Sequence, residues 1–577
     1  RNKKNRIIYS RDKKHFFSYV RYKLGGVKPV TQLEVAGRQM SDSQAADTFL
    51  AKFSKNFSPP MLETPAFGTT QILSTSVLLL NSTEGAVAEA LGACSNSSSS
   101  PDGISFRVLK MVAQYVIKPL NIICQQSFHQ GEFSSVWKHA VVIPLYKGRG
   151  LRSEASSYRP ISICACLGKV MEKIVSKQLV DYLTANNLLH NGQHGFTQGK
   201  STLTNLLTFD RYVSECQLDG HSYDILSFDF KKAFEMAPHN KVLQELRVKG
   251  VSGVALRWFS SFLSGRTHQV RVGDTLSHAA VVTSGVVEGS VLGPILYNVL
   301  ADSLLRRMRL PHAGYADDFK FVSDVTTNKK DDVQAEINVL ADWSEEYHMP
   351  LSVEKCLVLH CGPKQPLHAY TLNGSFMKSV DSMADLGVLR SSDGIYSGQC
   401  QAVAAKAARL AGALRRVFQH NRQELLWPAF KCYVIPVLMY NSPAWSPILQ
   451  RDIGVVEAVQ RRYTKHIYDL QHLNYQERLL RLGAFSLSNL RTYTDMVTVF
   501  KSLRNGMHTE FGLSLRESNT RGGGVRLMQQ CPKTRVASSL FMCRVPPVWN
   551  KLPTQVVSCN TLPVFKKVLS SHLFDIQ

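Results

Sequence analysis

A pair of adjacent aspartates, Asp317 and Asp318, interrupts a mainly apolar and aromatic stretch, AGYADDFKF at residues 313–321. The apolar and aromatic residues on either side predict two short strands that meet at a tight turn on the acidic pair. Two interpretations are open at this point. Asp is common in turns, so the pair fits an ordinary surface β-hairpin. Alternatively, the two carboxylates form part of a cation site, and other residues of the chain must distinguish these possibilities.

The size and charge of the chain limit the classes of protein to consider. At 577 residues it is too long for one compact core, so several domains or subdomains are expected. Its 68 basic and 44 acidic residues give a net charge of +24, and the basic residues are spread along the chain. This distribution predicts a long polyanionic partner, with nucleic acid first. A membrane surface is the alternative, but no amphipathic helix combines a Lys/Arg face with a bulky apolar side.

The cysteines and the hydropathy pattern exclude further classes. Twelve cysteines occur without paired CxxC units, so the sequence predicts neither a zinc module nor a disulfide framework. A reducing intracellular compartment fits best. No apolar run approaches the roughly 20 residues that a membrane span needs, so no membrane partner is expected.

Strand-like and helix-like patterns are mixed along the chain, which predicts an α+β class. Residues 1–30 are rich in Lys and Arg with interleaved aromatics, and residues 93–103 read as a flexible linker. The expected elements are strands at 139–147, 223–230, 269–274 and 279–285, and helices at 331–348 and 399–418.

A third carboxylate, Asp229, ends the strand-like run ILSFDF and precedes a helix-like segment. If the fold joins it to Asp317 and Asp318, the three could hold two divalent cations. Two metals roughly 4 Å apart stabilise the attacking and leaving oxygens of an in-line phosphoryl displacement. Mg²⁺ suits such a site because it accepts a few carboxylates and keeps positions for substrate phosphates and water. Spacing alone leaves this a hypothesis.

Three stretches, in this order, resemble the A, B and C motifs of reverse transcriptases: FDFKKAF, SGVVEGSVLGPILYN and YADD. Flanking stretches are similar to the non-LTR (LINE-type, jockey-like) retrotransposon enzymes. They are SPDGISFRVLK, SSYRPISICACLGKVMEKIV, NGQHGFTQGKST, PHNKV, LSVEKCLVL, DLGV, VLMYNSPAWSP and VPPVWNKLPTQVVSCNTLPVFKKVL. The resemblance runs from about residue 10 to the C-terminus.

This resemblance implies an α+β right-hand polymerase architecture of fingers, palm and thumb, with a helical C-terminal region. The expected divisions are a basic N-terminal region and linker at 1–95, fingers and palm at 96–392, the thumb at 393–470, and a nucleic-acid-binding region at 471–577. The helix at 399–418 resembles the thumb helix that tracks a duplex through phosphate contacts.

The resemblance also implies roles for individual residues. Asp229, Asp317 and Asp318 match the catalytic carboxylates. Asp229 and Asp317 are the expected direct metal ligands, together with the backbone carbonyl of Phe230, and Asp318 is the supporting carboxylate. Phe234 matches the steric gate, whose flat ring would collide with a ribose 2′-OH and select deoxynucleotides. An ordinary core aromatic is the alternative.

Several other residues are expected to bind substrate or primer. Lys147 and Arg159 would neutralise the incoming triphosphate, and Lys355 resembles the lysine proposed to protonate the pyrophosphate leaving group. Each of the three is also compatible with a solvated surface charge. Gly289 allows close approach of the backbone to substrate. The turn at Leu386 and Gly387 resembles the primer grip.

Three positions depart from the family pattern. Glu288 replaces the usual Gln before Gly289, Glu235 replaces the usual Asp after the gate aromatic, and Thr197 replaces a basic residue. A carboxylate at Glu288 lacks the donors of an amide, and its charge would repel an incoming triphosphate. The alternative reading is therefore a catalytically impaired remnant that binds RNA without efficient synthesis.

The function implied by the resemblance is an RNA-directed DNA polymerase that extends a DNA 3′-OH on an RNA template. It would use dNTPs and two Mg²⁺ ions, with Mn²⁺ as a possible substitute. Its expected location is cytoplasmic as a ribonucleoprotein and nuclear during integration, and we expect the endonuclease domain to be absent from this chain. A viral-type RNA-dependent RNA polymerase is the enzymatic rival. Those enzymes more often have Gly-Asp-Asp and a small gate residue, where this chain has Tyr315 and Phe234.

Overall fold

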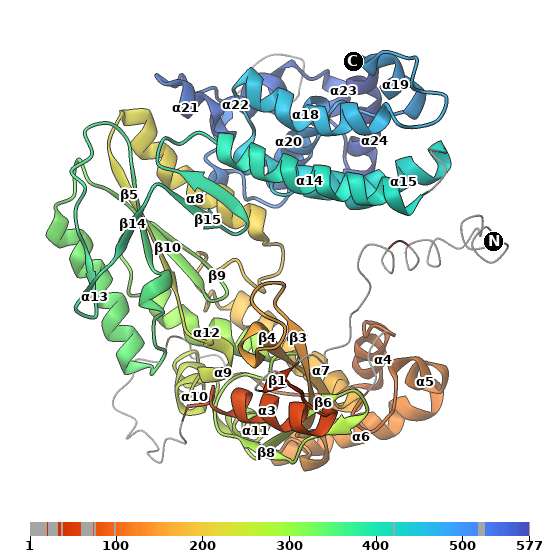
Figure 1. Cartoon of the computed structure of the whole chain (residues 1–577). Helices are drawn as coiled ribbons and strands as arrows, with labels where there is room; N and C mark the ends of the chain where they lie inside the picture. The colour runs from red at the N-terminus through yellow and green to blue at the C-terminus, as the bar shows by residue number, and fades with distance from the viewer. Residues whose placement is uncertain are drawn as a thin grey trace.

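The computed structural model describes residues 20, 33–35, 38–58, 73, 77–96, 100–418, 422–516 and 525–575. Figure 1 shows the C-terminal helices above, the N-terminal elements below, and a β-sheet that joins them on one side. The basic stretch before residue 33 lies outside the described residues apart from Val20, as do residues 97–99 of the expected linker.

The joining sheet has five strands in the order β14-β11-β5-β10-β9. All neighbours pair antiparallel except β11 and β14. Its strands are β5 (Tyr223–Asp229), β9 (His312–Tyr315), β10 (Asp318–Asp324), β11 (Leu357–Cys361) and β14 (Lys378–Val380). Strands β9 and β10 form the hairpin expected from the sequence, but its two-residue turn is Ala316–Asp317, one residue earlier than expected, because Asp318 already pairs with Tyr315.

Helices from the middle of the chain cover this sheet and fill the space beside it. They are α8 (Thr202–Asp219), α9 (Ala233–Met236), α10 (His239–Val248), α11 (Gly253–Leu263), α12 (Gly293–Leu305) and α13 (Lys330–Glu346). Helix α13 confirms the helix expected at 331–348. Its buried residues recur at helical spacing, because Val333, Ile337 and Leu340 share one face.

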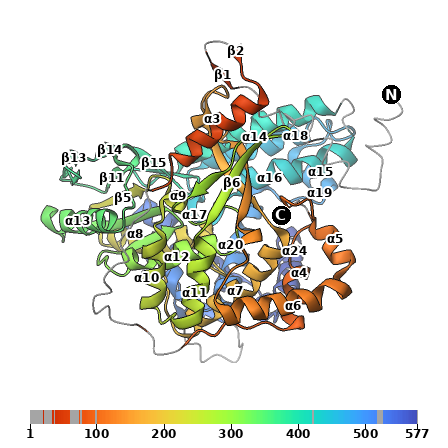
Figure 2. The same cartoon turned by 90° about the horizontal axis from the view of Figure 1, so that it is seen from below.

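A second sheet in the N-terminal part has the order β4-β3-β6-β7, with β8 also paired to β6. The strands are β3 (His139–Tyr146), β4 (Tyr158–Cys164), β6 (Arg266–Val272), β7 (Thr275–Leu276) and β8 (Ala280–Val282). Around it lie α3 (Asp42–Ser54), α4 (Glu84–Gly92), α5 (Phe106–Met111), α6 (Ala113–Gln130) and α7 (Cys166–Ala185). Seen from below, α3 lies against β6, and α10, α11 and α12 lie together (Figure 2).

The C-terminal part is mainly helical within the described residues. It begins after the hairpin of β15 (Ser382–Asp385) and β16 (Val388–Ser391). Its helices are α14 (Ser397–Val417), α15 (Gln423–Tyr433), α16 (Ile435–Met439), α17 (Ser442–Trp445), α18 (Gln450–Thr464), α19 (Tyr475–Leu482), α20 (Leu487–Arg504), α21 (Arg535–Ser539), α22 (Phe541–Lys551), α23 (Thr554–Val557) and α24 (Leu562–Asp575). Helix α14 confirms the helix expected at 399–418.

Three short strand pairs are also described: β1 (Glu34–Val35) with β2 (Arg38–Gln39), β12 (Thr371–Leu372) with β13 (Ser375–Phe376), and β17 (Leu515–Arg516) with β18 (Arg526–Leu527). Helices and mainly antiparallel strands are mixed throughout, which confirms the α+β class. None of the described helices has both the length and the apolar character that crossing a lipid bilayer requires.

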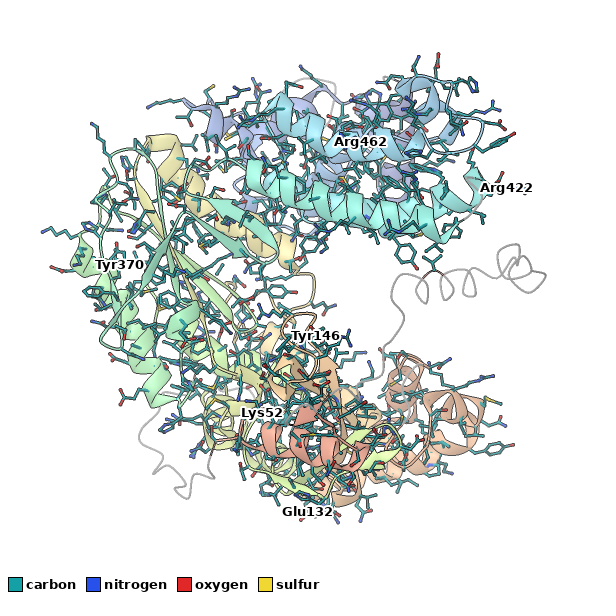
Figure 3. All side chains as sticks on the ribbon, viewed as in Figure 1. Lys52, Glu132, Tyr146, Tyr370, Arg422 and Arg462 are labelled. Carbon is teal, nitrogen blue, oxygen red and sulfur yellow. The ribbon has the colours of Figure 1, made fainter. Side chains whose placement is uncertain are left out.

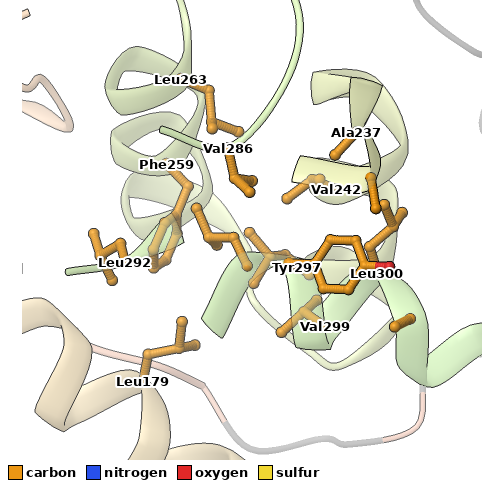
Figure 4. Close-up of a cluster of buried hydrophobic side chains, with 14 of the residues drawn as sticks. Leu179, Ala237, Val242, Phe259, Leu263, Val286, Leu292, Tyr297, Val299 and Leu300 are labelled. Atoms are coloured by element: carbon orange, nitrogen blue, oxygen red, sulfur yellow. The ribbon is translucent and has the colours of Figure 1, made fainter. Parts of the chain in front are cut away.

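Two large hydrophobic cores hold the molecule together. One lies under the five-stranded sheet and extends into α4, α7 and α10–α13. Figure 4 shows part of it, with Tyr297 among Val242, Val299 and Leu300. The other joins α14 to α24 and includes both Tyr463 and Leu479. Residues before and after position 470, the expected end of the thumb, therefore share one core.

Candidate active site

Three carboxylates meet where β5 pairs with β10. Asp229 ends β5 and is the register partner of Asp318, which begins β10, and Asp317 precedes it in the turn. Directly opposite residues on antiparallel strands have Cβ atoms roughly 5 Å apart, so these side chains are neighbours. Strand pairing thus brings together the acidic residues that lie far apart in the sequence.

Negative charge is concentrated at this point. Burial, followed by the charges of Asp317 and Asp229, raises the pKa of Asp318 to about 6. Burial also raises the pKa of Asp317, and the charge of Asp229 adds to it. The pKa of the Tyr297 hydroxyl lies well above its usual range because of burial and the same three carboxylates. A cation bound here would relieve this repulsion.

One cation of the protein already contacts the cluster. Lys355 Nζ lies 2.6 Å from Asp229 Oδ2, while its side chain remains 58% exposed. The backbone of this segment is fixed at the same place, because Ser352 N–H donates to the Asp229 carbonyl over 2.8 Å. The structure therefore places Lys355 at the carboxylate cluster, where its ammonium neutralises part of the charge.

The backbone geometry at Phe230 turns its carbonyl toward the acidic turn. Phe230 forms an antiparallel bridge with Leu351, and the flanking bonds are Lys231 N–H to the Pro350 carbonyl and Ser352 N–H to the Asp229 carbonyl. In such a non-hydrogen-bonded pair, the N–H and C=O of the bridged residue point away from the partner strand. The Phe230 carbonyl therefore points to the side on which β10 lies.

The donor set fits a hard divalent cation. The three aspartates are neighbours, but within the described ranges no group of three or more His, Cys, Asp or Glu side chains is arranged so that it could hold a metal ion as it stands. Carboxylate and carbonyl oxygens are nevertheless the ligands that Mg²⁺ and Ca²⁺ prefer. Burial is the main cause of the raised pKa values of Asp317 and Asp318, and the neighbouring aspartates add like charge that a cation would neutralise.

Phe234 lies beside this cluster with one face of its ring covered. The ring stacks on Tyr297 at a centroid distance of 4.7 Å and an interplanar angle of 16°. Phe196, itself 56% exposed, contacts it edge-on at 5.8 Å. Because Tyr297 lies in the core (Figure 4), its stacked ring holds the half-buried ring of Phe234 in place. The sequence interpretation missed Phe196, although it lies in the quoted stretch NGQHGFTQGKST.

The loop before α12 packs on its neighbours through glycines. Gly289 has a φ of +101°, and a Cβ there would overlap the Ser162 carbonyl oxygen of β4. Ser162 N–H in turn donates to the Glu288 carbonyl over 3.0 Å. At the other end of the loop, Val286 N–H donates to the Phe234 carbonyl over 2.8 Å. The loop that carries Glu288 is therefore tied to both β4 and the Phe234 segment.

Burial favours the protonated form of Glu288 near neutral pH. Burial raises its pKa to about 8, and the charge of Glu235 adds to the effect while Arg159 opposes it. Burial raises the pKa of Glu235 as well. A protonated carboxyl has an O–H donor, so near pH 7 Glu288 can donate a hydrogen bond as an amide would. The repulsion expected from the sequence applies only above about pH 8.

Lys147 and Arg159 lie at the end of the β3–β4 pair that reaches the middle of the molecule. Tyr146, labelled in Figure 3, marks this end of β3. Lys147 Nζ donates to the Ser156 carbonyl over 2.8 Å, and Arg159 is an exposed residue of β4. Burial, Arg159 and other nearby cations lower the pKa of Lys147, while Glu235 raises it. Both cations are therefore electrostatic neighbours of the carboxyl groups in this site.

Leu386 and Gly387 form the two-residue turn of the β15–β16 hairpin. Both have positive φ, at +45° and +81°, which is the pattern of a type I′ turn. Tyr440 packs against this turn, and its hydroxyl donates to the Leu386 carbonyl over 3.2 Å. The turn is thereby linked to the helical C-terminal part.

A buried charge network connects this hairpin to β10. Lys320 of β10 contacts both oxygens of Asp385 at 2.5 and 2.6 Å, and Arg390 Nε donates to Asp385 Oδ2 over 2.6 Å. Arg390 also pairs with Asp210 of α8 at 2.7 Å. All four residues are at most 6% exposed. The sequence interpretation missed this network because nothing local in it shows which distant charges pair.

A family model described as "Reverse transcriptase (RNA-dependent DNA polymerase)" matches residues 147–389. This span contains all three aspartates and ends just beyond the Leu386–Gly387 turn. Residues 147–389 belong to the reverse transcriptase family. Enzymes of this family generally use divalent metal ions, which agrees with the donor set described above.

The relatives belong to non-LTR retrotransposons, which confirms the resemblance stated from the sequence. A probable RNA-directed DNA polymerase from transposon BS of Drosophila melanogaster is 23% identical over 64% of this chain and 42% of that protein. The RNA-directed DNA polymerase from mobile element jockey of the same species is 23% identical over 63% and 41%. The Pol polyprotein from the type-1 element R2 of Popillia japonica is 28% identical over 29% and 25%.

The matched parts make up less than half of these relatives. Among solved structures, apo telomerase from Candida tropicalis, truncated from its C-terminal domain, aligns with a TM-score of 0.33 at 12% identity. That alignment covers 45% of this chain and 54% of the telomerase chain.

Proposed function

We propose that this chain is an RNA-directed DNA polymerase that extends a DNA 3′-OH on an RNA template. The observation that carries the proposal is the meeting of Asp229, Asp317 and Asp318 at one end of the β5–β10 pair, inside the reverse transcriptase domain. A primer-extension assay on a homopolymer template tests it directly. Lack of dNTP incorporation by the purified chain, across Mg²⁺ and Mn²⁺ concentrations, would overturn the proposal.

Mg²⁺ is the cofactor that best suits the donor set. Asp229, Asp317 and the Phe230 carbonyl would hold the ions, with Asp318 as a supporting carboxylate. When bound, a pair of such ions stabilises charge on the attacking and leaving oxygens of phosphoryl transfer. The protein itself keeps the carboxylates together by strand register and keeps Lys355 available beside Asp229.

The other residues of the site have roles that follow from their charge and position. Lys147 and Arg159 supply positive charge for the triphosphate, and Lys355 is the candidate proton donor to pyrophosphate. Gly289 keeps the backbone close to β4 and leaves room for the nucleotide beside Glu288. The Leu386–Gly387 turn would support the primer end.

The architecture proposed for this function is a right hand. The five-stranded sheet would be the palm, the β3–β4 region the fingers, and the helices from 393 to 470 the thumb, with residues 471–577 as a further nucleic-acid-binding region. The excess of positive charge supports RNA and DNA as partners, with strong salt dependence of binding. We extend the proposal to a cytoplasmic ribonucleoprotein that enters the nucleus for integration.

The impaired-remnant alternative depends on the departures from the family pattern. Its main support was a charged Glu288 next to the triphosphate. Because burial raises the pKa of Glu288 to about 8, this charge is absent at neutral pH. Two departures remain. Burial raises the pKa of Glu235 as well, and the Thr197 hydroxyl contacts the carbonyls of Gln193 and Gly195 at 3.2 Å. None of these observations favours the remnant over the active enzyme.

Replacing Phe234 tests the choice of sugar. If its ring blocks the space of a ribose 2′-OH, Phe234→Val should improve the use of ribonucleotides over deoxynucleotides by roughly 10- to 100-fold, the range that pocket shape can supply. Incorporation of rNTP and dNTP on one template measures this ratio. Phe228→Val, which shortens a fully buried ring of the same hydrophobic core, is the matched control for general loosening of the core. Equal ratios for the Phe234 variant and the parent would assign Phe234 to packing alone.

Glu288 predicts a pH dependence of nucleotide binding. A carboxyl whose pKa is raised to about 8 is neutral below that pH and charged above it. Two like charges roughly 6 Å apart interact by about 3 kcal/mol at an effective dielectric of 20, and screening by cations would leave about 1 to 2 kcal/mol. The KM for dNTP should therefore rise by about 5- to 30-fold as the pH increases from 7 to 9.5.

The matched control is Glu288→Gln, which cannot ionise. Its KM for dNTP should match that of the parent near pH 7 and stay nearly constant to pH 9.5. Steady-state incorporation at both pH values measures the difference. Parallel pH profiles for the two proteins would contradict the assignment of a protonated Glu288.

A further inference from the structure

A short segment, residues 192–195, lies along the outer edge of the β9–β10 hairpin. Gln193 forms a parallel bridge with Gly314 of β9. His194 N–H donates to the Gly314 carbonyl over 2.9 Å, and Gly314 N–H donates to the Gly192 carbonyl over the same distance. The segment therefore extends the sheet beyond β9, right beside the turn that carries Asp317.

The side-chain amide of Gln193 binds the turn itself. Its Oε1 accepts hydrogen bonds from Ala316 N–H at 2.9 Å and from Gly195 N–H at 2.8 Å. Its Nε2 donates to the Ala316 carbonyl over 3.3 Å. One side chain thus engages both polar backbone groups of Ala316. Gln193 is only 5% exposed, so water does not compete freely for these bonds.

Ala316 has a backbone conformation that an alanine adopts rarely. Its φ is +57°, in the left-handed region, where Cβ crowds the following carbonyl and glycine is favoured. Such a conformation persists only when its surroundings hold it in place. The residue it precedes is Asp317, whose carboxylate belongs to the acidic cluster. The direction of that carboxylate therefore depends on what holds Ala316.

Neighbouring residues fit the segment closely against the turn. A Cβ on Gly195 would overlap the Ala316 amide nitrogen, so the backbones are in direct contact there. The Gly195 carbonyl is fixed by Asn298 Nδ2 of α12 at 2.8 Å, and the Gly314 carbonyl accepts from Asn205 Nδ2 of α8 at 3.0 Å. The segment is anchored on both sides, so Gln193 extends from a rigid base.

We propose that Gln193 is a positioning residue that holds Ala316 in its left-handed conformation and thereby sets the direction of Asp317. This inference rests on the proposed polymerase function for its consequence in activity, since the side-chain hydrogen bonds of Gln193 go to Ala316 and to its own segment. A chain without this amide leaves the Ala316 N–H and carbonyl unpaired, and the turn relaxes toward conformations that alanine prefers.

The decisive experiment combines a variant that lacks the Gln193 amide with a second change that removes the backbone strain at Ala316. Gln193→Leu, close to Gln in size but unable to form these bonds, should lower primer extension by roughly 10-fold or more. It should also raise the Mg²⁺ concentration needed for half-maximal rate. Ala316→Gly in the same chain should restore most of both losses, because glycine adopts a positive φ without strain. Gln198→Leu, an exposed position in the same loop, is the matched control and should behave as the parent.

The rescue separates positioning from general stability. If Gln193 only stabilised the fold, the Ala316→Gly change would leave the double variant as impaired as Gln193→Leu, and this result would overturn the proposal. Full activity of Gln193→Leu at every Mg²⁺ concentration would overturn it as well.

A second readout is independent of catalysis. Hydrogen–deuterium exchange in a peptide spanning residues 313–319 should become faster in Gln193→Leu, while the Gln198→Leu control keeps the parent rate. Unchanged exchange in Gln193→Leu would refute the positioning role whatever the activity. If the parent itself extends no primer but the exchange result holds, the polymerase function fails and the hold of Gln193 on Ala316 stands.

Discussion

Asp317→Asn should abolish primer extension while leaving RNA binding largely intact. The substitution keeps the shape of the side chain and removes one charge from a cluster whose members are already close enough to raise one another's pKa. A divalent ion held there would lose an anionic ligand, and the loss of roughly 4 kcal/mol of transition-state stabilisation corresponds to about 1,000-fold in rate. Extension under single-turnover conditions and filter binding of template RNA measure the two effects.

The control for this substitution is Asp342→Asn, which makes the same change of charge at an exposed aspartate on α13, outside the acidic turn. It should retain parental extension, because the altered group is solvated. High Mn²⁺ should restore little activity to Asp317→Asn, since no added ion replaces the missing oxygen charge. Extension by Asp317→Asn within 10-fold of the parent would contradict the two-metal site.

The local parts of this site could be predicted from the sequence because local patterns determine them. Alternating apolar residues around Asp317 and Asp318 predicted a hairpin, and the apolar run before Asp229 predicted a strand. The pairing of β5 with β10 needed the fold, since nothing near Asp229 states which strand lies opposite. The resemblance to reverse transcriptases supplied that link through the order of the motifs.

Other features could not be read from the sequence because they depend on burial and on distant partners. Glu288 looked like a charge beside the triphosphate, but the surrounding loop and β4 bury it and leave it protonated at neutral pH. Gln193 was one polar residue in a loop until the fold placed its amide on Ala316. In both cases the residue type was visible, and the environment that gives it a role was not.

The role of Asp385 could not be predicted from the sequence either, although Asp385 is the first residue of the quoted stretch DLGV. Asp385 is 6% exposed and receives charged donors from Lys320 and Arg390. With Asp210, the network contains two cations and two anions, so its formal charges balance. Nearby cations lower the pKa of Asp385 against the effect of its burial, which keeps it charged. Its partners lie on β10 and β16, so the network joins the acidic turn to the Leu386–Gly387 turn.

Asp385→Asn should therefore destabilise the protein more than an average substitution. Removing one member of a buried ion pair leaves an uncompensated charge and costs about 3 to 5 kcal/mol. Burial already lowers the pKa of Lys320, and loss of Asp385 would lower it further. A buried lysine with a lowered folded-state pKa destabilises the folded protein while it is protonated. The loss of stability should therefore be largest near neutral pH and should shrink as the pH rises and Lys320 releases its proton.

Thermal unfolding midpoints at pH 7 and pH 9 measure this expectation, and Asp393→Asn, an exposed aspartate two residues after β16, is the control. Adding Lys320→Met to Asp385→Asn should recover several degrees relative to Asp385→Asn alone. The double variant removes one cation together with one anion and leaves the 2.7 Å Arg390–Asp210 pair charge-balanced. Destabilisations that simply add in the double variant would show that Lys320 and Asp385 are not coupled. If the double variant regained stability but its KM for primer stayed above that of the parent, Asp385 would matter mainly through the support that it gives to the adjacent Leu386–Gly387 turn.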